Sequence, residues 1–268
     1  MSFLISIFIF ILGASLGSFL SVVIHRTENK KKGMVLGRSQ CPHCKKNLQT
    51  IDLVPVLNYI YLKGKCRYCH KPIAPHYFFL ELSAGLILLL VYLKFPFFME
   101  ENGLTTLNST AALSFLFYGV DSMLLIGIFF YDLQYLKIPD IFLYPFIVSS
   151  LFGSLALHTS SEISLGVALV ISLIFFGGQR LISKGLWLGE GDVYLGAGMA
   201  LLFGWQLFLI SIVLTYVSGA IISLVLLASK KADGKTKIAF APFMVFGTFI
   251  TMFYGEQILN WYLHLLSY

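Results

Sequence analysis

Residues 3–24 read FLISIFIFILGASLGSFLSVVI and contain no charged side chain. A transmembrane helix needs roughly 20 mostly apolar residues, so this stretch is long enough to cross a bilayer once. No basic residue precedes it and no small-residue cleavage motif follows it. We therefore expect a retained membrane span and not a removable signal peptide.

The rest of the chain has a membrane-protein composition. Of its 268 residues, 57% are hydrophobic and 12% are charged, whereas soluble domains are typically about 25% charged. These values exclude an ordinary water-soluble globule and intrinsic disorder. The 25 Phe and 14 Tyr fit lipid contact and interfacial aromatic belts. Further apolar runs predict an all-α polytopic membrane protein with about eight transmembrane helices. The seven later runs are residues 77–93, 111–131, 138–157, 163–178, 193–203, 207–228 and 238–254.

The basic residues predict the orientation in the membrane, because short loops rich in Lys and Arg stay in the cytoplasm. Eleven of the 19 lie between Arg26 and Lys71. With eight spans and the N-terminus outside, only Lys94 falls on the outer side. The net charge of +6 is then a positive inner rim that suits anionic membrane lipids, and it needs no nucleic-acid partner.

The polar insertion at residues 26–76 contains all four cysteines, as Cys41-x2-Cys44 and Cys66-x2-Cys69. Two such pairs favour a tetrahedral four-thiolate zinc site with a structural role, in a zinc-ribbon-like insertion. Two disulfides are the competing interpretation, but they rarely persist in the cytoplasm. A neighbouring histidine in place of one cysteine is a minor alternative.

Two aspartates at predicted membrane edges favour hydrolytic chemistry. Asp132 closes the third span, and Asp192 opens the sixth within Gly189-Glu190-Gly191-Asp192. The predicted topology brings both to one membrane face. Two carboxylates that share one proton can activate a water molecule and protonate a peptide carbonyl. The flanking glycines allow close backbone approach, and either could equally be a helix-packing glycine.

Other acids have more ordinary interpretations. Asp121 lies about 16 Å deeper than Asp132 on the same helix face, which suits a structural or substrate-groove residue, and Glu81 is interpreted similarly. Asp140 follows Pro139 and most simply caps the next helix.

At these residues the chain resembles the type IV prepilin peptidases, which are GxGD aspartic membrane proteases. The resemblance covers most of the chain, from the N-terminal GSFLNVVIxR stretch through the cysteine insertion to the D-x6-P-D, GxGD and PF motifs. The matching residues are 17–26 (GSFLSVVIHR), 39–44, 52–57, 64–69, 132–140, 189–192 and 242–243. Ser21 stands where the family commonly has Asn.

The resemblance implies that Asp132 and Asp192 form a catalytic dyad, with Gly189, Gly191 and Pro139 in supporting roles. The implied substrates are prepilins or pseudopilins of pilus, competence or secretion systems, whose short basic leader is removed at the cytoplasmic face of the bacterial inner membrane. Because the basic insertion would repel this leader, we expect Glu190, Asp140 or Asp121 to meet it. N-methylation of the new N-terminal residue from S-adenosylmethionine would follow. The implied domains are a first span (1–25), a methylation-linked zinc insertion (26–76) and a peptidase domain (77–268).

Two other functions compete with this interpretation. A secondary transporter would place cation-binding acids at the membrane midplane on broken helices, whereas the key acids here lie at one edge. A scaffold of a secretion or competence apparatus would depend on its cysteine insertion and not on its aspartates.

Overall fold

The computed structural model describes residues 2–29, 39–41, 43–101, 104–230 and 236–267. Four of the eleven basic residues of the polar insertion, at positions 30–32 and 38, lie outside the described residues. The chain divides into two compact units, Met1–Phe115 and Leu116–Tyr268, here called unit 1 and unit 2. Both are helical, as the composition predicts.

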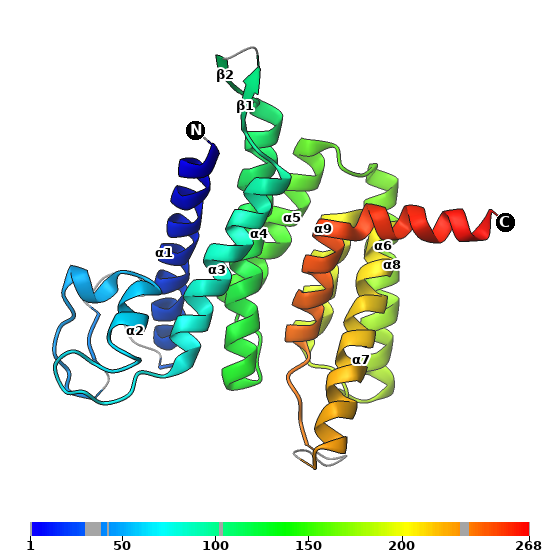
Figure 1. Cartoon of the computed structure of the whole chain (residues 1–268). Coiled ribbons are helices and arrows are strands. Elements are labelled where there is room, and N and C mark those ends of the chain that lie inside the picture. The colour runs from blue at the N-terminus through cyan, green and yellow to red at the C-terminus, as the bar shows by residue number, and fades with distance from the viewer. Residues whose placement is uncertain (1, 30–38, 42, 102–103, 231–235, 268) are drawn as a thin grey trace. The chain divides into compact units, whose positions relative to one another are not determined.

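Unit 1 pairs two long helices. Helix α1 (Ser2–Glu28) packs against α3 (Pro75–Lys94). Between them in sequence come the cysteine insertion, the 3-10 turn η1 (Thr50–Leu53) and the short helix α2 (Leu57–Tyr61), which lie to one side of the helix pair (Figure 1). The two long helices approach closely because glycines lie in their interface. A Cβ atom at Gly17 would sit 2.8 Å from the Cβ of Ala84. A hairpin of β1 (Phe98–Glu101) and β2 (Leu104–Leu107) follows α3.

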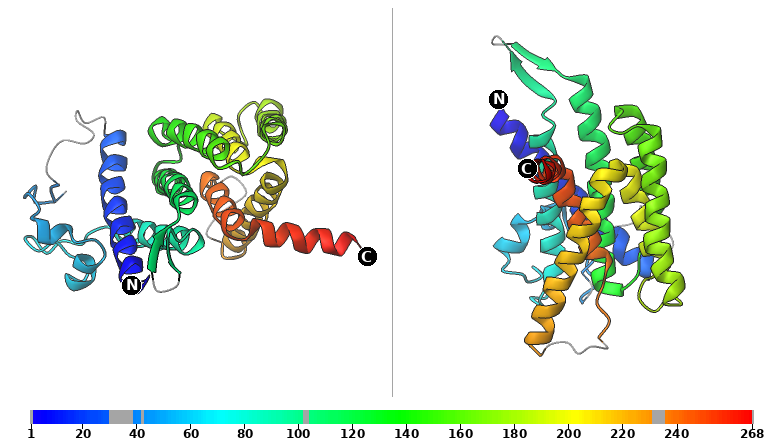
Figure 2. Two further views of the ribbon diagram at one scale, coloured as in Figure 1. Left: turned by 90° about the horizontal axis from the view of Figure 1, so that it is seen from above. Right: turned by 90° about the vertical axis from the view of Figure 1, so that its right-hand side faces the viewer.

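Unit 2 contains most of α4 (Ser109–Tyr135) and the helices that follow it. These are α5 (Asp140–Leu157), α6 (Glu162–Ser172), α7 (Gly178–Ile182), α8 (Glu190–Ala228) and α9 (Ala241–Leu266). A π-helical turn, η2 (Leu173–Gly177), joins α6 to α7 without ending the helix. Figure 2 shows the helices of unit 2 nearly end-on in the view from above, and Figure 1 shows the last part of α9 leaving the direction of its first part.

Helix α8 is two spans and not one. Its 39 residues would be about 58 Å long as a straight helix, about twice the hydrocarbon thickness of a bilayer. Gly204 breaks it with φ 71° and ψ 175°, a conformation that side chains disfavour. Serine hydroxyls bind the carbonyls released there: Ser154 donates to Leu201 at 2.7 Å and Ser160 donates to Phe203 at 3.1 Å.

The contacts of α8 establish that its halves run in opposite directions. The first half follows α5, with Gly191 beside Ile138 and Gly198 beside Phe146. The second half returns along α9, with Gly255 beside Leu207 at the far end and Gly219 beside Phe243 at the near end. The near end is common to both halves, because the N–H of Ala241 at the start of α9 binds Asp132, and Ile138 follows Asp132 by six residues.

The predicted number of spans agrees with this arrangement. Six helices of the described residues are long and apolar enough to cross a membrane, and α8 counts once among them. Dividing α8 at Gly204 separates the predicted runs 193–203 and 207–228. Helix α9 is outside the six and corresponds to the last predicted run, so about eight transmembrane segments result.

Candidate active site

Asp132 lies in the last turn of α4 and is 5% exposed. Its Oδ2 atom accepts a hydrogen bond of 3.1 Å from the backbone N–H of Ala241, the first residue of α9. The first N–H groups of a helix have no partner within the helix and carry partial positive charge. The N-terminus of α9 therefore stabilises negative charge on Asp132.

Asp192 lies in the first turn of α8 and is half-buried. Its Oδ2 atom accepts a 2.8 Å hydrogen bond from the backbone N–H of Gly189, three residues earlier. This is one half of a capping box, in which a side chain in the first turn binds the N-cap backbone. The GxGD stretch thus begins α8 and fixes the carboxyl group of Asp192 at its N-terminus.

The loop after α4 brings the two aspartates to one end of unit 2. Leu136 ends α4 with a positive φ of 54°, and its N–H bonds to the carbonyl of Asp132 at 2.9 Å. The chain then turns so that Ile138 lies against Gly191, where an added Cβ would be 2.8 Å from the Cβ of Ile138. The carboxyl groups of Asp132 and Asp192 lie close enough for the charge of Asp132 to act on Asp192.

Tyr216 joins this site and was not predicted from the sequence. Its hydroxyl lies close enough to Asp192 for the charge of that carboxyl group to act on it. The hydroxyl donates a 2.8 Å hydrogen bond to Oε1 of Gln179. Its ring lies 5.5 Å from that of Phe240, which directly precedes Ala241. A tyrosine within an apolar run carries no local signal of function, and only the turn of α8 at Gly204 brings it back toward Asp192.

The other predicted residues at this end have different surroundings. Glu190 is exposed and forms an ion pair with Arg180 at 3.3 Å. Asp140 is exposed and is the first residue of α5, and Pro139, with extended backbone, is the N-cap residue. Asp140 therefore lies inside the first turn and is not the cap itself.

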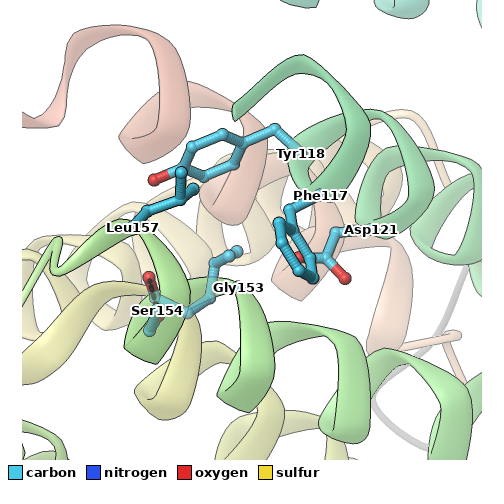
Figure 3. A pocket seen from close by; sticks show the side chains of 7 residues that line it. Phe117, Tyr118, Asp121, Gly153, Ser154 and Leu157 are labelled. Carbon is cyan, nitrogen blue, oxygen red and sulfur yellow. Dashed lines mark hydrogen bonds between the residues drawn. The ribbon is translucent and has the colours of Figure 1, made fainter. Parts of the chain in front are cut away.

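Asp121 is far from this end and is 1% exposed. Figure 3 shows Phe117, Tyr118 and Asp121 of α4 reaching toward Gly153, Ser154 and Leu157 of α5 around a small cavity. The centre of a water molecule can occupy about 10 Å³ of this cavity, which is room for one water molecule. Ser149 is a nearby donor, yet neither carboxyl oxygen makes a well-formed hydrogen bond to a described residue.

The four cysteines of unit 1 converge. Their sulfur atoms all lie within 4.8 Å of one another, and those of Cys41 and Cys69 are 3.9 Å apart. A disulfide requires about 2.05 Å, so none of the four forms one. Tetrahedral zinc with bonds of about 2.3 Å requires sulfur atoms about 3.8 Å apart. The four thiol groups therefore fit a zinc ion, and they leave no open position for a reacting molecule.

The two Cys-x2-Cys turns have the same backbone design. Each is closed by an antiparallel bridge, Gln40 to Asn47 in one and Lys65 to Pro72 in the other. The residue after each second cysteine, Lys45 or His70, has a positive φ of 59° or 56°. Neither turn needs a histidine ligand, because its two thiols already face the other pair.

Charges beside the cysteine cluster are paired. Asp52 forms an ion pair with Arg67 at 2.8 Å and accepts a hydrogen bond from the hydroxyl of Tyr68. That hydrogen bond raises the pKa of Tyr68. The backbone N–H of Lys71 lowers the pKa of Cys69, but burial and the three neighbouring thiols together raise it to about 11. The surrounding thiols thus disfavour the thiolate form of Cys69.

Comparison with known proteins places the chain among membrane peptidases. Residues 11–95 match the bacterial peptidase A24 N-terminal domain, and residues 119–224 match the type IV leader peptidase family. The chain is 27% identical to a prepilin leader peptidase/N-methyltransferase of Stutzerimonas stutzeri, over 94% of this chain and 92% of that protein. Proteins of the same description from Legionella pneumophila (28% identity; 89% and 79% covered) and Pseudomonas aeruginosa (26%; 94% and 91%) are also similar.

No solved structure matches the chain significantly. The two family matches follow one another along the sequence, and together they include the cysteine cluster, Asp132 and Asp192. The similarity to the Stutzerimonas stutzeri protein covers 94% of this chain, whose described part contains six helices long and apolar enough to cross a membrane. The chain therefore belongs to the type IV leader peptidase family.

Proposed function

We propose that this protein is a membrane aspartic endopeptidase that removes the short basic leader from prepilins or pseudopilins. N-methylation of the new N-terminal residue follows. The observation that supports the proposal is that Asp132 and Asp192 lie at the same end of unit 2, near enough for their charges to interact. The two aspartates are 60 residues apart in sequence, and the contact between Ile138 and Gly191 joins the loop after Asp132 to the first turn of α8, which contains Asp192.

Each carboxyl group is anchored by one oxygen atom. In the part of the chain that the structure describes, Oδ2 of each aspartate accepts a backbone hydrogen bond. Their Oδ1 atoms are therefore available to a water molecule and to a substrate carbonyl. We assign the hydrolytic roles to these two atoms.

The proposed reaction needs one proton on the pair, because two adjacent carboxylates do not both stay ionised. The ionised carboxylate takes a proton from water while the water oxygen bonds to the scissile carbonyl carbon. The neutral carboxyl group gives its proton to the carbonyl oxygen. The C–N bond then breaks as the leaving amine takes a proton from one carboxyl group. A hydroxyl group of the tetrahedral intermediate returns its proton to the other carboxylate, so the pair again holds one proton.

The basic leader fits the exposed acids beside the dyad. Glu190 and Asp140 are exposed, and Glu190 already binds one guanidinium group, that of Arg180. A basic leader can exchange with Arg180 at little cost because exposed ion pairs contribute only about 0–1 kcal/mol. Asp121 is 1% exposed, so we assign it no contact with the leader.

Zinc in this proposal has a folding role. Cys41, Cys44, Cys66 and Cys69 would hold it, and the ion would join the two turns of an insertion that has little core. The methyl donor, S-adenosylmethionine, supplies the methyl group for the second activity. The cavity beside Asp121 admits only one water molecule, whereas sites for molecules of that size have about 300–1,000 Å³. The donor therefore does not bind there.

The proposed placement in the bacterial inner membrane follows from the charges. Basic side chains after the end of α1 and before the start of α3 favour the cytoplasm for the cysteine insertion. By the same rule the dyad faces the cytoplasm and the N-terminus lies outside. We retain the first span (1–25), the zinc insertion (26–76) and the peptidase domain (77–268) as the proposed functional division.

Substitution of the dyad tests the proposal. Asp132→Asn and Asp192→Asn keep the side-chain shape but cannot exchange the proton, so each should abolish leader removal. The purified variants are incubated with a prepilin and S-adenosylmethionine, and product masses report cleavage and methylation separately. Glu162→Gln, at the exposed start of α6, is the matched control and should cleave normally. Normal processing by either aspartate variant would refute the dyad.

A further inference from the structure

The cysteine insertion carries an exposed apolar face. Six large apolar side chains within residues 50–61 are 40–81% exposed, although they belong to an insertion that is otherwise polar. We call them the apolar strip. Its members are Ile51, Leu53, Val54, Leu57, Ile60 and Tyr61. Six exposed apolar side chains within twelve residues are more than the isolated ones that are normal on a protein surface, so this segment is a candidate interaction site.

The strip is fixed to a membrane-spanning helix. The backbone N–H of Val56, in the middle of the strip, donates a 2.8 Å hydrogen bond to Oε2 of Glu81 in α3. The ring of Tyr59 stacks on Phe78 of the same helix, with centroids 5.1 Å apart. Both anchors lie within the first two turns of α3, which begins at Pro75.

These anchors place the strip at the level of the bilayer surface. Helix α3 has 20 residues and is therefore about 30 Å long, which matches the hydrocarbon thickness of a bilayer. Glu81 is six residues, or about 9 Å, inside its first residue. Because the backbone N–H of Val56 reaches the carboxylate of Glu81, Val56 and the residues on either side of it lie at the depth of the membrane boundary.

Local strain turns the strip outward. Val56 has φ 63° and ψ −55°, and the N–H of Leu57 bonds to the carbonyl of Pro55 at 2.6 Å. This is a γ-turn with positive φ, which is rare, and rarer still at a β-branched residue. The turn buries Val56, which is 8% exposed, while Val54 and Leu57 beside it point outward.

The charges around the strip suit an anionic surface. Lys63 and Lys65 are exposed directly after it. The acid of this segment, Asp52, is neutralised by Arg67, and its side chain is 3% exposed. The strip therefore has a basic flank and an uncovered apolar face, which is the pattern of segments that lie in a membrane interface.

We propose that residues 50–65 form an interfacial segment that buries the apolar strip in the lipid leaflet where α3 begins, with Lys63 and Lys65 against anionic headgroups. Two observations favour lipid over a protein partner. Residues of the strip segment contact Glu81 and Phe78 of a membrane-spanning helix, and the charge of the flanking lysines is complementary to anionic lipid. The proposal depends only on membrane insertion and not on the peptidase activity.

Fluorescence quenching by lipid tests the proposal in the full-length protein. The three native tryptophans, Trp187, Trp205 and Trp261, are replaced by Phe, and Tyr61→Trp provides the only tryptophan. The protein is placed in nanodiscs of phosphatidylcholine and phosphatidylglycerol, with or without lipid brominated close to the headgroup. We expect brominated lipid to quench Tyr61→Trp strongly. Asn47→Trp, in the exposed first cysteine turn, is the control and should be quenched little.

The remaining outcomes separate lipid from protein. Equal quenching of the two tryptophans would overturn the proposal. So would a tryptophan at position 61 that is shielded from aqueous acrylamide but insensitive to brominated lipid, because protein would then cover the strip. The double variant Lys63→Glu, Lys65→Glu should lower the quenching in anionic but not in neutral nanodiscs. If the tryptophan-free background does not fold, the difference in quenching between Tyr61→Trp and the unmodified protein gives the same information.

Discussion

Gly191, the residue before Asp192, has less space for a side chain than Gly189 at the start of the same motif. A Cβ atom at Gly191 would sit 2.8 Å from the Cβ of Ile138, whereas one at Gly189 would meet only Oδ2 of Asp192 at 3.2 Å. Neither glycine has a positive φ, so the difference is one of space. Carbon atoms in contact are normally about 3.5–4.0 Å apart. Gly191→Ala must therefore move α8 from the Ile138 loop by about 0.7 Å or more.

This displacement should reduce both stability and activity. Overpacking of this kind costs about 1–3 kcal/mol, which corresponds to about 2–4 °C in the unfolding midpoint for each kcal/mol. A displacement near 1 Å of a catalytic group can cost about 100-fold in rate. We expect Gly191→Ala to cleave prepilin 10- to 100-fold more slowly by these estimates, and Gly189→Ala to lose much less. Initial rates from product masses, together with thermal unfolding in detergent, measure both effects.

A second substitution identifies the cause. Ile138→Gly removes the Cβ that Gly191→Ala would strike, so the double variant should recover part of the lost rate relative to Gly191→Ala. Full activity of Gly191→Ala, or a larger loss in Gly189→Ala, would refute the argument that the Ile138 contact sets the position of Asp192.

Three further substitutions separate the other features. Cys41→Ser should release bound zinc, measured as metal per chain by atomic absorption, and raise amide hydrogen exchange in residues 39–74; unchanged zinc content would contradict the four-thiolate site. Asp121→Asn should retain cleavage and leave the unfolding midpoint unchanged or higher, since it removes a buried carboxyl group with poor hydrogen bonding; a loss of cleavage would give Asp121 a part in the reaction. Tyr216→Phe should slow cleavage roughly 2- to 10-fold, the value of one hydrogen bond of about 0.5–1.5 kcal/mol. Tyr194→Phe, whose hydroxyl makes an exposed 3.4 Å contact with Glu190, is its control, and equal effects of the two would refute a specific role for Tyr216.

Much of this fold could be predicted because membrane spans are local. Length and apolar character identify each helix without its neighbours, and the break at Gly204 coincides with the gap between two predicted apolar runs. The cysteine cluster was predictable for a similar reason, since two short turns contain all four ligands. The shared backbone design of these turns could not be predicted, because the residue with positive φ is Lys45 in one turn and His70 in the other.

Contacts that depend on packing could not be found in the sequence. The donor to Asp132 is a backbone N–H, at Ala241, and no residue type encodes it. Its position does have a sequence correlate: Pro242 follows it, and proline is well tolerated in the first turn of a helix, where no N–H partner is required. The strain at Val56 is equally hidden, because Pro55-Val56-Leu57 reads as an ordinary apolar segment.

The position of both carboxyl groups at helix N-termini explains how a membrane protein can hold a charged pair at its site. Burial disfavours the ionised form of each aspartate. Helices α8 and α9 each provide a backbone N–H to one Oδ2 atom, and helix N-termini stabilise negative charge. Each aspartate alone could therefore ionise, but their mutual repulsion opposes the second charge. In the proposed dyad a single shared proton would satisfy both effects, and it is the state that the proposed hydrolysis requires.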